Sequence, residues 1–185
     1  MKRVGVFCGS RIGARPEYRK LAQALGAALA DRGIELVYGG ASVGTMGVLA
    51  DAALAAGGRV IGVIPTWMKE RELAHGSLTE LHCVDSMHER KNLMAELSDS
   101  FVALPGGLGT YDELFEMLTW TALNLHIKPC GLLDVLDFFG PLRGAIDRAV
   151  VEGFLDAAAR DAIMVSESAF DLLDRLAAAS RGTGG

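Results

Sequence analysis

Apolar residues in this chain form short runs rich in valine, isoleucine and leucine, separated by longer stretches with helical periodicity. The runs predict strands at residues 3–8, 34–38, 59–64, 81–84, 101–104, 130–133 and 162–165. The periodic stretches predict helices at residues 16–32, 45–56, 87–98, 111–124, 138–152 and 168–179. Strands that are apolar throughout and alternate with helices indicate an α/β fold, a doubly wound, Rossmann-like parallel sheet of about seven strands with helices on both faces.

The chain length bounds the domain organisation. With 185 residues and no internal repeat, the chain predicts a single nucleotide-binding domain over residues 1–179. Residues 180–185 are expected to form a disordered tail. Residues 66–77 have weak periodicity and predict a loop over the binding pocket.

Composition and charge exclude several classes of protein. The formal net charge is −5 and no basic stripe is present, which argues against a nucleic-acid binder. No apolar run approaches the roughly 20 residues needed to cross a bilayer, and the first strand leaves no room for a signal segment, so we expect a cytoplasmic protein without a membrane partner. Cys8, Cys83 and Cys130 lack metal-ligand spacing, so we expect reduced, buried, structural cysteines and no metal site.

Glycine-rich turns follow three of the predicted strands. In a parallel sheet these turns meet at the carboxyl edge, where glycine lets backbone N–H groups approach a phosphate closely. Three tight turns without a ligand are the alternative interpretation. The candidate substrate-binding residues in these turns are Gly9, Ser10, Gly39, Gly40, Gly44, Thr45, Met46, Gly106, Gly107, Gly109 and Thr110.

Two familiar nucleotide-binding motifs do not fit this spacing. A dinucleotide-binding fold needs GxGxxG after the first strand and an acidic residue at the end of the second, but the second strand here ends in Gly39 and Gly40. A phosphate-binding loop needs a lysine where Thr45 stands. The spacing therefore argues against a hydride-transfer dehydrogenase and against a kinase or triphosphatase.

Charged residues open two of the predicted helices. Ser86 with Glu89, and Thr110 with Glu113, each fit a capping box, which offers a purely structural role for Glu113. The alternative is that Glu113, in the first turn of a helix aimed at the ligand edge, takes part in the chemistry.

Two long motifs resemble those of the Lonely Guy family, the cytokinin riboside 5′-monophosphate phosphoribohydrolases. Residues 105–113 (PGGLGTYDE) fit the family's PGGxGTxxE, and residues 87–91 (MHERK) fit its MHxRK. The resemblance extends to residues 39–47 (GGASVGTMG) and to residues 118–120 (LTW), and so covers nearly the whole chain. Older labels call such proteins lysine decarboxylases, but no lysine here has the context of a pyridoxal Schiff base.

The resemblance implies a cofactor-free hydrolase that releases free base and ribose 5-phosphate from N6-modified adenosine 5′-monophosphates, and a homodimeric assembly. By motif position, Arg90 and Glu113 match the catalytic pair, and Lys91, Thr119 and Glu72 match substrate-binding positions in addition to the glycine turns. A nucleotide or cofactor carrier without catalysis is the alternative function.

The chemistry of these two side chains suits cleavage of a glycosidic bond. An ionised Glu113 can stabilise a positively charged ribose and orient water, and Arg90, which stays charged, can hold phosphate or stabilise charge.

The expected homodimer has weak support in the sequence itself. Apolar residues at 115, 117, 118, 120 and 123 exceed what one amphipathic face needs, which favours a dimer contact or additional core.

Overall fold

The computed structural model describes residues 1–69 and 74–182, and its described strands form one parallel sheet in the order β4-β3-β2-β1-β5-β6-β7. The strands are β1 (Arg3–Phe7), β2 (Glu35–Tyr38), β3 (Val60–Pro65), β4 (Glu80–Val84), β5 (Ser100–Ala103), β6 (Cys130–Leu133) and β7 (Ile163–Ser166). Each lies within a residue or two of its predicted position. The predicted doubly wound α/β fold is confirmed.

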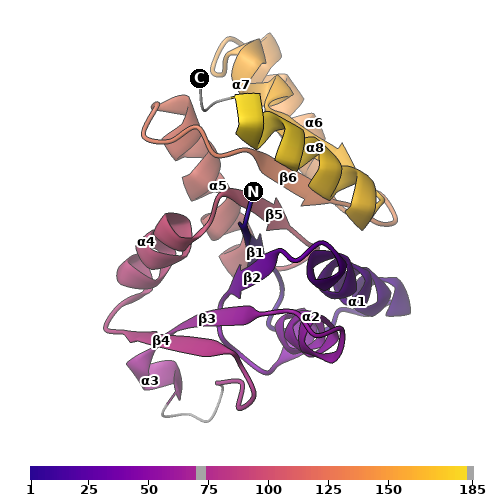
Figure 1. Ribbon diagram of the computed structural model, residues 1–185. Coiled ribbons are helices and arrows are strands. Elements are labelled where there is room, and N and C mark those ends of the chain that lie inside the picture. Colours follow the sequence, from indigo (N-terminus) through magenta and orange to yellow (C-terminus); the bar gives the residue numbers. More distant parts are fainter. Residues whose placement is uncertain (70–73, 183–185) are drawn as a thin grey trace.

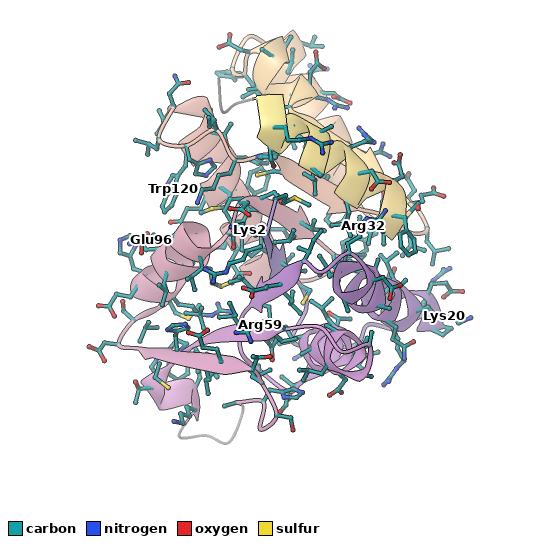
Figure 2. All side chains as sticks on the ribbon, viewed as in Figure 1. Lys2, Lys20, Arg32, Arg59, Glu96 and Trp120 are labelled. Atoms are coloured by element: carbon teal, nitrogen blue, oxygen red, sulfur yellow. The ribbon has the colours of Figure 1, made fainter. Side chains whose placement is uncertain are left out.

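Helices cover both faces of the sheet, as Figure 1 shows. The helices are α1 (Pro16–Asp31), α2 (Gly44–Ala55), α3 (Thr66–Lys69), α4 (Met87–Leu97), α5 (Leu108–Ala122), α6 (Gly140–Val151), α7 (Ala157–Asp161) and α8 (Ala169–Gly182). One face is covered by α1, α2 and α8, and the other by α4, α5 and α6. Figure 2 marks the two sides, with Lys20 and Arg32 on the α1 side and Glu96 and Trp120 on the α4 and α5 side.

The core is built from uniformly apolar strands. The central strands β1, β2, β3 and β5 are buried along almost their whole length because helices pack on both faces. The edge strand β4 contains only exposed and half-buried residues. Cys83 is exposed there, so the expectation that all three cysteines are buried is wrong for this residue, while Cys8 and Cys130 are buried and all three are free thiols.

Several boundaries differ from the sequence prediction. The last helix extends to Gly182, so residues 180–182, expected in a disordered tail, are helical. The segment expected as a loop over the pocket begins with the short helix α3. The five-residue α7 was not predicted because so short a segment has no measurable periodicity. Within the described residues, no helix combines the length and apolarity needed to cross a membrane.

Candidate active site

The three glycine turns meet at the carboxyl edge of the sheet because β1, which precedes the first, lies between β2 and β5, which precede the others. A methyl group placed on Gly9 would lie 3.5 Å from Gly106 Cα and 3.5 Å from Thr45 Oγ1. One on Gly106 would lie 3.1 Å from the Gly9 nitrogen. The order of strands reverses between β1 and β5, which is where ligands bind in doubly wound sheets.

The second glycine turn holds the first in place through hydrogen bonds. Both the backbone N–H and the hydroxyl of Thr45 donate to the Gly9 carbonyl oxygen at 3.0 Å, and the Met46 N–H approaches it at 3.4 Å. Gly44 has φ +63°, and a methyl group there would lie 2.3 Å from the Ser10 carbonyl carbon. The N–H groups of Thr45 and Met46, expected to bind a ligand directly, are thus already used to hold the first turn.

The third turn carries hydrogen-bonding groups that can bind a ligand. Gly107 is the N-cap of α5, and the first N–H groups of a helix have no partner inside it. The Thr110 side chain is buried, and its Oγ1 makes no hydrogen bond within the described residues. Gly109 borders open space. The start of α5 can therefore hold a phosphate through its N–H groups and this hydroxyl.

Arg90 from α4 and Glu113 from α5 form a buried ion pair beside these turns. Arg90 Nη1 donates to Glu113 Oε1 at 2.8 Å, and each side chain is only 8% exposed. Arg90 Nε donates to the carbonyl oxygen of Val63, within β3, at 3.0 Å. A methyl group on Gly39 would lie 2.0 Å from Arg90 Nη2, so the glycine at the end of β2 leaves the space that the guanidinium occupies.

Electrostatics at the pair favour a titratable carboxylate. Burial raises the pKa of Glu113, and the attraction of Arg90 and its hydrogen bond act in the opposite direction. Burial also raises the pKa of the nearby Cys8 thiol to about 12, which makes it an inert core group rather than a nucleophile. Glu113 is therefore the ionisable group at this edge whose environment suits acid, base or electrostatic chemistry.

Lys91 faces the carboxylates of α5. Its Nζ lies 3.0 Å from Asp112 Oδ2 and 3.1 Å from Glu116 Oε2, and the Lys91 side chain is 14% exposed. Burial lowers the pKa of Lys91, but the two carboxylates outweigh burial and the net shift is upward. Lys91 therefore ties α4 to α5 directly beside the Arg90–Glu113 pair.

Only one of the two expected capping boxes caps a helix. Ser86 is the N-cap of α4, and its Oγ accepts the Glu89 N–H at 3.1 Å. The structural role considered for Glu113 is wrong, because α5 begins at Leu108 and places Thr110 and Glu113 inside the helix. The carboxylate of Glu113 is thus directed to Arg90 and not to a helix end.

The remaining predicted residues fall in different places. Ser10 is exposed at the first turn, and the Gly40 carbonyl oxygen accepts the His75 N–H, which ties His75 to the second turn. Thr119 is exposed on α5 beside Phe115 and Leu123, on an apolar surface that none of the glycine turns borders. Glu72 lies outside the described residues.

Sequence reasoning missed the partners that position the charged residues. The Val63 carbonyl group carries no side-chain signal and was not predictable. Asp112 and Glu116 did carry one, because acidic residues four apart share a helix face and flank Glu113. Among the described residues, no group of three or more histidine, cysteine, aspartate or glutamate side chains could hold a metal ion.

Comparisons with known proteins identify relatives of this chain in sequence and in fold. A family model described as "Possible lysine decarboxylase" matches residues 46–176. The chain is 53% identical to a cytokinin riboside 5′-monophosphate phosphoribohydrolase of Rhodococcoides fascians, over 89% of this chain and 83% of that protein. It is 46% identical to one of Arabidopsis thaliana, over 95% and 82% of the two chains. A molybdenum cofactor binding protein of Rippkaea orientalis has the same fold, with a TM-score of 0.72 over 96% of each chain and 24% identity.

Proposed function

This chain belongs to the family of cytokinin riboside 5′-monophosphate phosphoribohydrolases, and from that membership we propose that it hydrolyses the N-glycosidic bond of N6-modified adenosine 5′-monophosphates. We propose plain adenosine monophosphate as a second substrate. The products are the free base and ribose 5-phosphate. The observation that carries the proposal is the buried Arg90–Glu113 pair, 2.8 Å between Nη1 and Oε1, beside glycine turns that can hold a phosphate.

Cleavage of this bond develops positive charge on the ribose and negative charge on the departing base, and a catalyst must stabilise both. The Glu113 carboxylate stabilises the oxocarbenium-like ribose and orients the attacking water. The water gives its hydroxyl group to C1′ and a proton to the leaving nitrogen of the base. Arg90 cannot supply that proton, since it stays charged, and its role is to hold Glu113 ionised and in place.

The glycine turns provide the binding site for the 5′-phosphate. The start of α5 offers N–H groups and the Thr110 hydroxyl, while Gly9, Ser10, Gly106 and Gly107 allow close approach. Gripping the phosphate there aligns the sugar with Glu113 on the next turn of the same helix. Glu72 remains a candidate for recognition of the base.

The test of this function is a chromatographic assay of free base. The purified protein is incubated with isopentenyladenosine monophosphate, adenosine monophosphate and the two corresponding nucleosides. We expect base release from the nucleotides and little from the nucleosides, because nucleosides lack the phosphate group that the glycine turns bind. Equal turnover of nucleoside and nucleotide contradicts the phosphate site, and thermal stabilisation by nucleotide without base release favours a carrier.

We also propose that the protein is a homodimer that associates through the exposed apolar face of α5. Phe115 on this helix is 41% exposed and Leu123, directly after it, is 64% exposed, whereas Met117 is buried in the core. Together with neighbouring residues of α6 and α7 they line a shallow apolar hollow of about 200 Å³. An apolar surface of this kind is unfavourable in water unless a second chain covers it.

A further inference from the structure

His75 lies against the second glycine turn and bonds both to the turn and to the helix after it. Its backbone N–H donates to the Gly40 carbonyl oxygen at 2.9 Å, near the start of the turn. Its side-chain Nε2 lies 3.0 Å from Asp51 Oδ1 on α2, the helix that follows the turn. The His75 side chain is only 9% exposed, whereas that of Asp51 is 73% exposed. One residue thus connects the beginning of the turn to the helix into which the turn leads.

The hydrogen bonds of the His75 ring fix which nitrogen carries the proton. The Ser77 N–H donates to Nδ1 at 3.2 Å, so Nδ1 is the acceptor nitrogen of the ring. Nε2 therefore carries the proton and donates it to the Asp51 carboxylate, which makes a charge-assisted hydrogen bond. Since both ring nitrogens are used, the ring is held in one orientation.

The neighbouring residues extend this contact. Ala41 and Ala74 form an antiparallel β-bridge. The buried Tyr38, at the end of β2, donates its hydroxyl to the Ala41 carbonyl oxygen at 3.2 Å. The backbone at residues 40 and 41 is therefore bonded both by β2 and by residues 74 and 75.

The same backbone packs against the groups that position Arg90. A methyl group on Gly39 would lie 2.0 Å from Arg90 Nη2, and one on Gly40 would lie 3.3 Å from the Val63 nitrogen. Val63 is also the residue whose carbonyl oxygen accepts the Arg90 Nε–H. Two consecutive glycines have large conformational freedom, so contacts from outside the turn must restrict it. The bonds made by His75 are contacts of this kind.

We propose that His75 and Asp51 are positioning residues for the reaction. Their hydrogen bond fixes the second glycine turn, and the turn keeps Arg90 aligned with Glu113. The pair acts through the backbone of the two glycines, which separates it from the guanidinium group. This inference rests on the proposed function for its effect on catalysis, because it concerns the placement of one member of the proposed catalytic pair.

The kinetic test removes the bond at its exposed partner. Replacing the exposed Asp51 side chain should leave the protein folded, and Asp51→Asn keeps an oxygen that accepts the His75 Nε2 proton. We expect Asp51→Ala to lower kcat for isopentenyladenosine monophosphate by about threefold to tenfold, the effect of losing one hydrogen bond, with little change in KM. Asp51→Asn should recover most of this loss. Adding Asp51→Ala to His75→Phe should cause no further loss, because the two residues act through one bond.

Hydrogen exchange reports the placement of Arg90 without catalysis. The buried Arg90 Nε proton, which bonds to Val63, is followed by NMR. We expect it to exchange with solvent about threefold to tenfold faster in Asp51→Ala than in the wild-type protein, and at the wild-type rate in Asp51→Asn. Glu80→Ala is the matched control, because it breaks a histidine–carboxylate pair on β4, His82 with Glu80 at 2.9 Å, and should change neither kcat nor this exchange.

The outcomes separate positioning from stability and from the function itself. Unchanged kcat or unchanged Arg90 exchange in folded Asp51→Ala protein overturns the inference, even if the unfolding temperature falls. A loss of kcat that Asp51→Asn does not recover also overturns it, because the hydrogen bond would not be the cause. Absence of base release by the wild-type protein overturns the proposed function instead, and the exchange of the Arg90 proton still tests whether the pair positions this side chain.

Discussion

The Arg90–Glu113 pair concentrates the chemistry of this protein in two side chains. Each is almost fully buried, so each depends on the other for compensation of its charge. Removing one partner of a buried ion pair leaves an uncompensated charge, which is far more costly than replacing both. The two side chains therefore act as a unit. We place the reacting sugar beside this pair, near the Thr110 hydroxyl, which makes no hydrogen bond within the described residues.

Replacement of either charged residue should abolish most of the activity. Glu113→Gln keeps the shape and an acceptor for Arg90 but loses the negative charge, and Arg90→Ala loses the positive one. Since electrostatic groups of this kind are typically worth ~10²-fold or more in rate, we expect each variant to release base at least ~10²-fold more slowly while its circular dichroism spectrum stays native. Near-parental turnover in either folded variant would remove that residue from the mechanism.

The pH dependence of the reaction should report the environment of Glu113. Burial raises its pKa, so the carboxyl group binds a proton at a pH where an exposed glutamate is already ionised. Because the ionised form is the active one in our mechanism, kcat/KM should fall as the pH falls through this raised pKa, above the ordinary value of about 4.3. Residual activity of Arg90→Ala should fall off at still higher pH, because the attraction of Arg90 lowers the pKa. An acid limb at the ordinary glutamate value contradicts this assignment.

A substitution at Gly39 tests whether the Arg90 guanidinium group needs the space beside this glycine. Gly39→Ala would place a methyl group 2.0 Å from Arg90 Nη2, so the side chain must move and activity should fall by about tenfold or more while the fold is kept. Gly144→Ala on α6 is the matched control, because a methyl group there meets nothing within 4 Å. Base release and thermal unfolding are measured for both, and parental activity in Gly39→Ala would contradict the geometry.

At the scale of secondary-structure elements, α4 and α5 are joined by two parallel sets of ion pairs. Arg90 pairs with Glu113, and its neighbour Lys91 pairs with Asp112 and Glu116. Arg90 and Lys91, which are consecutive on α4, thus pair with acidic residues at neighbouring positions of α5. This arrangement favours a positioning role for Lys91, whereas the family motif suggests a contact with the nucleotide.

The two roles of Lys91 predict different kinetics. As a positioning residue, Lys91→Met should lower kcat with little change in KM, and Lys91→Arg should recover part of the activity because arginine can still pair with both carboxylates. A direct contact with substrate predicts a higher KM with unchanged kcat instead. Lys20→Met, on the opposite side of the sheet (Figure 2), is the control and should leave both constants unchanged.

At the scale of the whole molecule, the apolar face of α5 determines the expected assembly. We expect light scattering to give twice the chain mass of 19.6 kDa at working concentration. Leu123→Glu places a charge on the exposed part of this face and should shift the protein toward monomer without unfolding it. Lys20→Glu, which places a charge on the other side of the molecule, should remain dimeric. A monomeric wild-type protein would overturn the proposed homodimer.

Local signals predicted the elements well and their edges less well. The helix expected from residue 111 begins at Leu108, because the glycines at 107 and 109 predict a loop when read without their surroundings. The same error suggested that Thr110 and Glu113 formed a capping box. Cys83 was expected in the core because its strand is apolar, but β4 lies at the edge of the sheet and has a neighbour on one side only.

The sequence by itself determined the alternation of strands and helices, the glycine turns at the carboxyl ends of strands, and the two motifs that identify the family. Each is a local property, since periodicity and turn chemistry depend on residues close together in the chain. Only the tertiary structure decided that Arg90 meets Glu113, that Lys91 is bound to α5, and that His75 bonds to Asp51. These contacts depend on strand order and helix packing, which bring together residues that no local pattern relates.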